Sequence, residues 1–270
     1  PPGAPERAPL AAFGDPYFST AQAVAANDKP PREIAGLGPV RGVPLRLRAS
    51  PKTTEADSAG LAMLPRLPDT RDEVRSIALA LRADVGSSVF LGAEANEERV
   101  KTMDLSGVKV LVFATHGLVP GDLDGLTQPA LALSAPELSG TAGDGLLTMG
   151  EILELRLNAD WVVLSACNTG AGDGLGAEAV SGLGRAFFYA GSRALLASNW
   201  PVHSVSAKAL TTDLFRWQSD EPGLGRSESL RRAMVAMIDG GGFQDAGGRT
   251  VFAYAHPLFW APFSLIGDGE

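Results

Sequence analysis

The sequence predicts an α/β domain of three layers, in which helices flank both faces of a mostly parallel central sheet. Short runs that are apolar at almost every position, such as residues 108–114 and 161–166, are typical of strands buried on both faces. Between these runs lie stretches with apolar residues three and four positions apart, which is typical of helices. Strands that alternate with helices in this way favour a parallel sheet.

The N-terminal part of the chain contains a linker, a strand and a long loop. Residues 1–9 are rich in proline and are interpreted as a linker, so the domain is expected to span residues 10–270. The apolar run at residues 10–16 predicts a buried strand that ends at Gly14. Residues 27–60 are rich in proline, glycine and mixed charge and are interpreted as a loop.

Helical signals return at Thr70. Thr70 and Glu73 have the spacing of a capping box, in which each side chain bonds the backbone N–H of the other residue. Apolar residues then recur at helical spacing through residue 81. A strand at residues 87–92 and a short helix at residues 96–103 are expected to follow.

The remainder of the chain continues the alternation. Strands are predicted at residues 108–114, 130–134, 161–166, 194–198 and 263–267. Helices are predicted at residues 149–155, 176–190, 204–217 and 227–238. The helix at residue 149 follows a second capping box, formed by Thr148 and Glu151.

The composition excludes several classes of protein. The formal charge of −8 gives no basic face for nucleic acid, and the apolar runs are far too short to span a membrane. The single cysteine cannot form an internal disulfide and fits a reducing compartment, so we expect a cytoplasmic protein. Because the first residue is Pro1 and not methionine, we expect a piece of a longer protein.

Two of the predicted strands end in residues that can carry chemistry. His116 follows one strand, and Cys167 follows another 51 residues later (167 − 116 = 51). That separation leaves room for the two strands to be neighbours, with both tips at the carboxyl edge of the sheet, where sites gather. A thiolate–imidazolium pair there could attack a carbonyl, and His116 would protonate the leaving amine.

The residues around the pair fit the same chemistry. The backbone N–H groups of Gly117 and Cys167 are candidate donors for the oxyanion that forms on attack. Taken singly, a buried role for Cys167 and a hydrogen-bonding role for His116 are the more common outcomes. The two strand ends taken together favour catalysis. Neither the lone cysteine nor the histidines have the spacing of metal ligands.

Of four other residues, three have alternative interpretations. Trp200 could line a substrate pocket or belong to the core, and Asp173 could receive a basic substrate side chain or be a solvated loop acid. His203 could line a pocket, although a surface position at a helix N-terminus is favoured. His256 precedes a proline and is expected to order a turn.

Five segments resemble, in order, the blocks of the CHAT domain, a caspase-like cysteine peptidase domain of clan CD that often follows tetratricopeptide repeats. They are VLVFATHG, DGLLTMGEIL, WVVLSACNTG, GLGRAFFYAGSRALLASNWPV and HPLFWAPFSLIGD. LAAFGDPYF and LPDTRDEV resemble earlier blocks, so the resemblance covers nearly the whole chain from Leu10. Caspases also place the histidine about 50 residues before the cysteine, so that spacing is part of the resemblance.

The resemblance implies a caspase-like fold, with His116 as general acid–base, Cys167 as nucleophile, Gly117 as an oxyanion donor, and no metal or cofactor. It also implies that residues 197–200 lie on the strand that pairs with extended substrate backbone, which makes Ser198, Asn199 and Trp200 substrate-binding residues.

The chain departs from the family pattern in three ways. The family often has an acid where this chain has Asn168, and acids where His203 and Ser204 follow the tryptophan-proline motif. The family's leading segment, which normally precedes the first strand, is not found.

The predicted function is that of a cysteine endopeptidase governed by an attached tetratricopeptide-repeat or other sensor module, in bacterial signalling or defence. Its partners would be protein or peptide substrates, with no nucleic acid and no membrane. Asp173 and Glu178 would suit Arg or Lys before the cut bond, and an apolar pocket around Trp200 would suit Leu or Met. The alternatives are an inactive scaffold that binds peptides or proteins, and a non-peptidase cysteine hydrolase.

Overall fold

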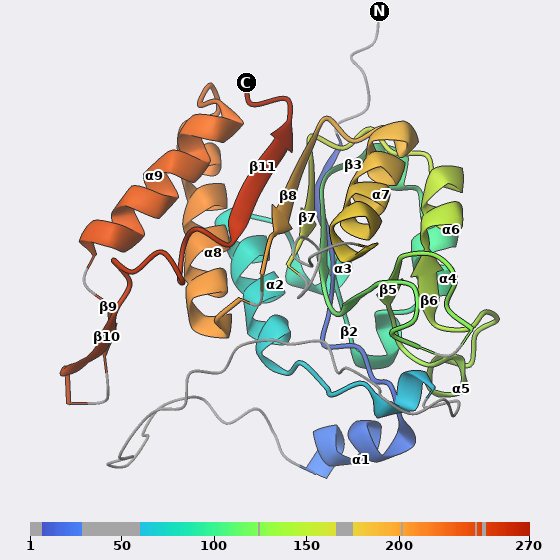
Figure 1. Cartoon of the computed structure of the whole chain (residues 1–270). Coiled ribbons are helices and arrows are strands. Elements are labelled where there is room, and N and C mark those ends of the chain that lie inside the picture. Colours follow the sequence, from blue (N-terminus) through green and yellow to red (C-terminus); the bar gives the residue numbers. More distant parts are fainter. Residues whose placement is uncertain are drawn as a thin grey trace, which may run out of the picture.

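The structure is a computed structural model that describes residues 7–28, 60–123, 125–165, 175–200, 202–240, 242–244 and 247–270, with the backbone alone at 27–28 and 175–181. A six-stranded sheet with the order β11-β8-β7-β3-β1-β2 lies at its centre (Figure 1). Its strands are β1 (Ala8–Gly14), β2 (Val89–Leu91), β3 (Val108–Ala114), β7 (Trp161–Leu164), β8 (Ala194–Ser198) and β11 (Phe263–Gly267). Only β11 runs antiparallel to its neighbour, so the predicted mostly parallel sheet is confirmed.

Helices cover both faces of this sheet. One face is covered by α2 (Asp69–Ala80), α8 (Ser204–Asp220) and α9 (Arg226–Asp239), and the other by α4 (Glu97–Thr102), α6 (Met149–Glu154) and α7 (Leu175–Ala190). In Figure 1, α8 and α9 lie to the left of the sheet and α6 and α7 to the right. The predicted three layers are therefore confirmed. No helix in the described part of the chain is both long and apolar enough to cross a membrane.

The alternation of side chains along each strand builds the two cores. In β3, Val110 and Val112 pack in the core under α2 and α8, whereas Leu111 and Phe113 pack in the core under α6 and α7. Because both faces are buried, the strand is apolar at nearly every position, which is the pattern that identified it in the sequence.

Two smaller groups of strands lie outside the central sheet. A three-stranded antiparallel sheet contains β4 (Gly117–Leu118), β5 (Ala130–Ala132) and β6 (Leu146–Thr148). A hairpin contains β9 (Gly242–Gln244) and β10 (Thr250–Ala253). The strand predicted at residues 130–134 is thus confirmed, but it pairs with the segment after His116 instead of joining the central sheet.

Short helical segments complete the described chain. They are α1 (Thr20–Asp28), α3 (Val85–Ser88), α5 (Pro136–Ser139), η1 (Leu61–Met63), η2 (Gly92–Glu94) and η3 (Leu105–Gly107). Helix α1 was not predicted, because its alanine-rich sequence carries no apolar stripe. It overlaps the start of the predicted loop at residues 27–60, and residues 29–59 lie outside the described part of the chain. The predicted linker is two residues too long, because β1 begins at Ala8, which pairs with Val108.

The capping box predicted at Thr70 and Glu73 is wrong. Helix α2 begins at Asp69, and Thr70 is buried within its first turn. The Thr70 hydroxyl donates to the Leu67 carbonyl at 2.7 Å and accepts the Asp15 N–H at 2.7 Å. These contacts join α2 to the end of β1. The second capping box, formed by Thr148 and Glu151, is confirmed.

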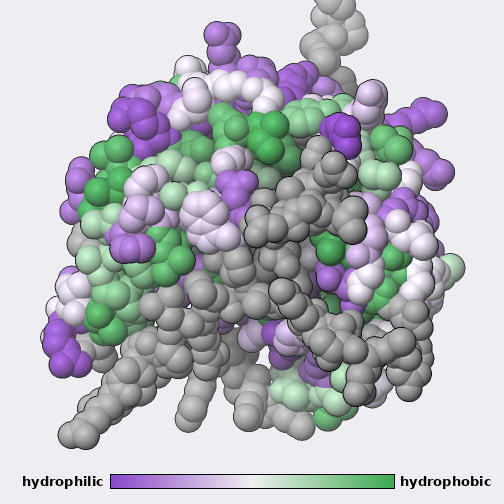
Figure 2. All heavy atoms as spheres, viewed as in Figure 1, coloured by the Kyte–Doolittle hydropathy of each residue, from purple (hydrophilic) through white to green (hydrophobic). Residues whose placement is uncertain are grey.

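The exposed large apolar side chains are scattered singly over the described surface. Each lies on a different element: Val24, Met63, Leu79, Leu153, Tyr189, Val205, Val235 and Ile266. Figure 2 likewise shows hydrophobic and hydrophilic side chains interspersed over the face in view.

Candidate functional site

The carboxyl ends of β3 and β7 lie side by side at one edge of the sheet. Phe113 pairs with Leu164, and the Ser165 N–H donates to the Phe113 carbonyl at 3.0 Å. The prediction that these two strands are neighbours is confirmed. His116 stands three residues beyond Phe113, and Cys167 stands three residues beyond Leu164.

Several predicted site residues lie outside the described part of the chain. These are Cys167, Asn168 and Asp173; the side chain of Glu178, in α7, is also outside it. Their roles therefore stay predictions, and the site is built here from the residues that surround them.

His116 is fully buried, and its ring contacts Pro65 and Phe18. Its Nε2 lies 2.7 Å from the carbonyl oxygen of Pro65, and its ring centroid lies 5.6 Å from that of Phe18. Because a carbonyl only accepts hydrogen bonds, Nε2 must carry the hydrogen. In the neutral ring Nδ1 is then the basic nitrogen.

The backbone around His116 is fixed by β5. The His116 carbonyl accepts the Ala132 N–H at 2.9 Å, and Gly117 pairs with Leu131. The Thr115 hydroxyl donates to the Ala132 carbonyl. The strand that follows His116 is therefore part of an ordered sheet, with Gly117 buried within it.

A buried polar contact lies beneath the other strand end. The Ser165 hydroxyl, two residues before Cys167, donates to Glu73 Oε1 at 2.6 Å, and the Thr211 hydroxyl lies 3.5 Å from the same oxygen. This carboxylate joins the end of β7 to α2 and α8. The sequence reasoning missed it by assigning Glu73 to a cap. The available signal was its place four residues before Ile77, on the apolar face of the helix.

The residues at the end of β8 are largely used inside the protein. Ala197 pairs with Leu164 on one side and Ser264 on the other, and Ser198 is buried and pairs with Phe263. A substrate strand therefore cannot add at Ala197, which corrects that part of the expectation for residues 197–200. The cause is β11, which occupies the outer edge of β8.

Asn199 and Trp200 follow this paired segment. The Asn199 N–H donates to the Pro262 carbonyl at 2.7 Å, and its side-chain amide donates to the Ser264 hydroxyl at 2.6 Å. The amide of Asn199 thus fastens β8 to the chain before β11. Trp200 is half-buried just beyond this junction.

The two remaining histidines have structural positions. His203 is the N-cap of α8, where its Nδ1 accepts the Ser206 N–H at 3.4 Å. The helix N-terminal position is confirmed, but the predicted surface exposure is wrong, because the rings of Phe252 and Phe259 bury His203. His256 accepts a backbone N–H two residues later at 3.1 Å, so the predicted turn is confirmed.

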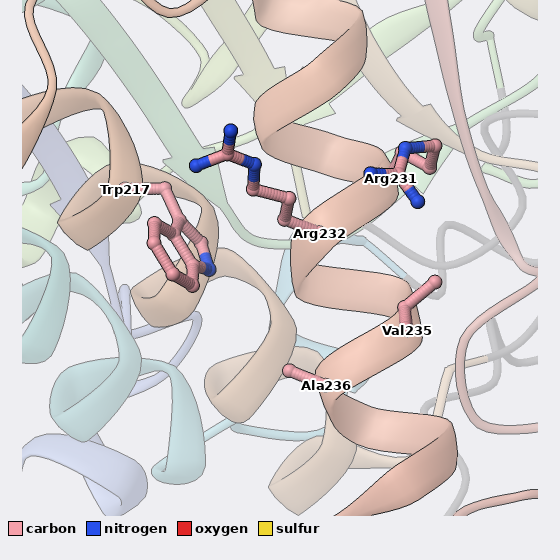
Figure 3. Close-up of a pocket in the computed structure, with 5 residues that line it drawn as sticks. All are labelled: Trp217, Arg231, Arg232, Val235 and Ala236. Atoms are coloured by element: carbon pink, nitrogen blue, oxygen red, sulfur yellow. The ribbon is translucent and has the colours of Figure 1, made fainter.

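A shallow hollow between α8 and α9 lies away from this edge (Figure 3). Its charged side chains are paired: Arg232 lies over the Trp217 ring at 5.1 Å and bonds Glu228 at 2.9 Å, and Arg231 bonds Glu228 at 2.6 Å. None of the residues proposed for catalysis lines it, so it is not part of the candidate site.

The chain is similar to several known proteins. Tetratricopeptide repeat protein 28 of Mus musculus is 35% identical over 260 residues, and its Homo sapiens counterpart is 28% identical over 263 residues. Each match covers 82% of this chain and 10% of the relative, so the chain spans about a tenth of their length. The crystal structure of the Arg-specific cysteine proteinase gingipain R aligns with a TM-score of 0.43 and 12% identity over 73% of this chain and 41% of that one. The CHAT domain family model matches residues 2–268, nearly the whole sequence. The chain therefore belongs to the CHAT domain family.

Proposed function

We propose that the chain is a cysteine endopeptidase in which Cys167 is the nucleophile and His116 the general acid–base. The register of β3 and β7 supports this proposal: Phe113 pairs with Leu164, and His116 and Cys167 each follow these residues by three positions in the sequence.

The contact with Pro65 supports the role of His116. A hydrogen on Nε2 leaves Nδ1 as the nitrogen that takes the thiol proton. The Pro65 carbonyl also accepts a stronger hydrogen bond from the charged imidazolium than from the neutral ring. It therefore stabilises the ion pair that activates the thiol.

The proposed reaction has two stages. The Cys167 thiolate forms a bond to the substrate carbonyl carbon. The resulting oxyanion accepts hydrogen bonds from the backbone N–H groups of Gly117 and Cys167. When the C–N bond breaks, Nδ1–H of His116 gives its proton to the leaving amine and a thioester remains. Water, deprotonated by His116, then attacks the thioester, which releases the carboxylic acid and restores the thiol.

Substrate and partner assignments belong to the same proposal. Trp200, half-buried beyond β8, is the proposed side-chain contact for substrate, together with Asp173. The relatives' name supports a parent protein that carries tetratricopeptide repeats. In this proposal the repeats control the access of specific protein substrates to the domain.

The test is turnover of a fluorogenic peptide panel by the wild type and two variants. Cys167→Ala and His116→Gln should each abolish turnover. His256→Gln is the matched control, because it changes a histidine in an exposed turn and should leave turnover unchanged. Equal turnover by the wild type and Cys167→Ala would remove the nucleophile from the proposal.

A further inference from the structure

A buried carboxylate lies at the carboxyl end of β1, next to the segment that holds His116. Asp15 follows Gly14, the last residue of β1, and is fully buried. Its carboxylate accepts two hydrogen bonds from Arg66, Nε to Oδ1 and Nη2 to Oδ2, both at 2.7 Å. It accepts a third from Arg71 Nε at 2.9 Å. One acid is thus shared by two guanidinium groups.

The bond pattern fixes Arg66 in orientation as well as in position. Two parallel bonds hold the guanidinium in the plane of the carboxylate. The guanidinium also packs on the ring of Tyr17, at 4.9 Å from its centroid, and Arg71 donates to the Tyr17 hydroxyl at 3.2 Å. Arg66 is thereby tied to the end of β1, although it is more than fifty residues away in the sequence.

Arg66 is covalently joined to the group that contacts the catalytic histidine. The Pro65 carbonyl belongs to the planar peptide unit that ends at the Arg66 nitrogen, so the two cannot move independently. On the other side, the Leu64 carbonyl accepts the Gln22 side-chain N–H at 2.7 Å. The acceptor of the His116 bond is therefore clamped through both of its neighbours.

The backbone conformation at Asp15 does not explain why the residue is an aspartate. Its φ is +48°, in the left-handed region that glycine and asparagine adopt readily. Either residue would suit this turn without burying a charge, and a buried ion pair gives little net stability over apolar residues of similar size. The carboxylate is better explained by what it holds in place.

We propose that Asp15 is a positioning residue for His116: through Arg66 it holds the Pro65 carbonyl against Nε2 and so keeps the hydrogen off Nδ1. The kinetic part of this inference rests on the proposed peptidase function. The structural part does not, because it concerns the tautomer of one histidine in the folded chain.

The tautomer of His116 can be determined by long-range ¹H–¹⁵N NMR on protein in which the histidines are labelled with ¹⁵N. With only three histidines the spectrum is simple, and His116→Gln identifies the signals of His116. The wild type should show the Nε2–H form. Asp15→Asn should give a mixture of the two forms, with ring N–H exchange faster by about tenfold or more as the clamp loosens. Asp72→Asn is the control, because Asp72 is an exposed acid in the first turn of α2. It should change neither the tautomer of His116 nor the exchange rate of its ring N–H.

A second variant guards against loss of folding. Arg66→Lys keeps the positive charge but cannot form two parallel bonds, so it should shift the tautomer in the same direction. An unchanged tautomer and exchange rate in folded Asp15→Asn would overturn the proposal. If Asp15→Asn does not fold, the same result in Arg66→Lys would overturn it.

Kinetics separate this proposal from the proposed function. If the wild type cleaves peptides, Asp15→Asn should lower kcat by about tenfold to a hundredfold with KM nearly unchanged, because the acid–base group is displaced and the substrate contacts are not. Should the wild type cleave none, the proposed function fails, and the NMR comparison still decides the role of Asp15.

Discussion

Replacing Thr70 by valine removes one buried hydroxyl and keeps the shape of the side chain. The hydroxyl accepts the Asp15 N–H at 2.7 Å and donates to the Leu67 carbonyl at 2.7 Å. The carbonyl keeps the Thr70 N–H as a donor at 3.1 Å, whereas the buried Asp15 N–H loses this acceptor. Leaving such a group unsatisfied costs about 1–3 kcal/mol. The free energy of unfolding should fall by that amount.

Urea denaturation measures the loss. With an m-value of about 3 kcal/mol/M, a loss near 2 kcal/mol lowers the midpoint by about 0.7 M. Thr102→Val is the matched control: its hydroxyl also donates to a backbone carbonyl, that of Glu98 at 2.8 Å, but at an exposed position. The change should therefore stay within about 0.5 kcal/mol. Equal midpoints for the two variants would refute the reasoning.

Thr70→Asp distinguishes the observed role of Thr70, its hydrogen bonds with Asp15 and Leu67, from the role of a helix N-cap. At an N-cap, aspartate is as good as threonine or better. In the observed position it would bury a carboxylate close to Asp15, so it should destabilise the chain more than valine does. An aspartate variant as stable as the wild type would mean that Thr70 caps the helix after all.

Two further predictions concern stability. Phe187→Ala should lower the free energy of unfolding by about 3–5 kcal/mol, because the ring is fully buried against β3. Tyr189→Ala on the same helix should lower it by less than about 0.5 kcal/mol, because Tyr189 is 83% exposed. Thermal denaturation measures both variants, and equal losses of stability would contradict this prediction. Hydrogen bonds from Arg231 and Arg232 lower the pKa of Glu228 from 4.5 to about 2. Its charge therefore stabilises the fold above pH 4.5, and the benefit disappears as the pH falls toward 2. Glu228→Gln should be less stable than the wild type at pH 7 and approach it on acidification, and a difference that stays constant down to pH 3 would contradict this.

The central sheet could be predicted from the sequence because burial on both faces leaves a local mark. The apolar runs that became β3 and β7 identified the strands, and the residues after them, His116 and Cys167, followed from where the runs end. The neighbouring placement of the two strands also followed, since the 51 residues between His116 and Cys167 leave room for the crossover that neighbouring parallel strands need.

The contacts that position the site residues have no such signature in the sequence. A backbone carbonyl 51 residues away contacts His116, and the identity of Pro65 says nothing about where its carbonyl points. Thr70 and Glu73 fit a local capping pattern, but tertiary contacts with Asp15 and Ser165 use both side chains instead. A local pattern cannot reveal which distant group competes for the same atoms.

The position of β11 was equally invisible to local reasoning. The resemblance implied that residues 197–200 lie on a strand that pairs with substrate, which requires an open edge on β8. Its outer edge is filled by a strand that begins at Phe263, 65 residues after Ser198 (263 − 198 = 65). The antiparallel pairing of a C-terminal strand is a property of the topology and not of either segment.

The most direct test of the account is the pH dependence of alkylation at Cys167. Because this is the only cysteine, intact mass after reaction with iodoacetamide reports that thiol alone. A free cysteine titrates at about pH 8.5, and a paired imidazolium lowers that value by a unit or more. The wild type and His256→Gln should react with a midpoint at least about one pH unit below 8.5, and His116→Gln should return it to about 8.5. The same midpoint in the wild type and His116→Gln would contradict the pairing of His116 with Cys167.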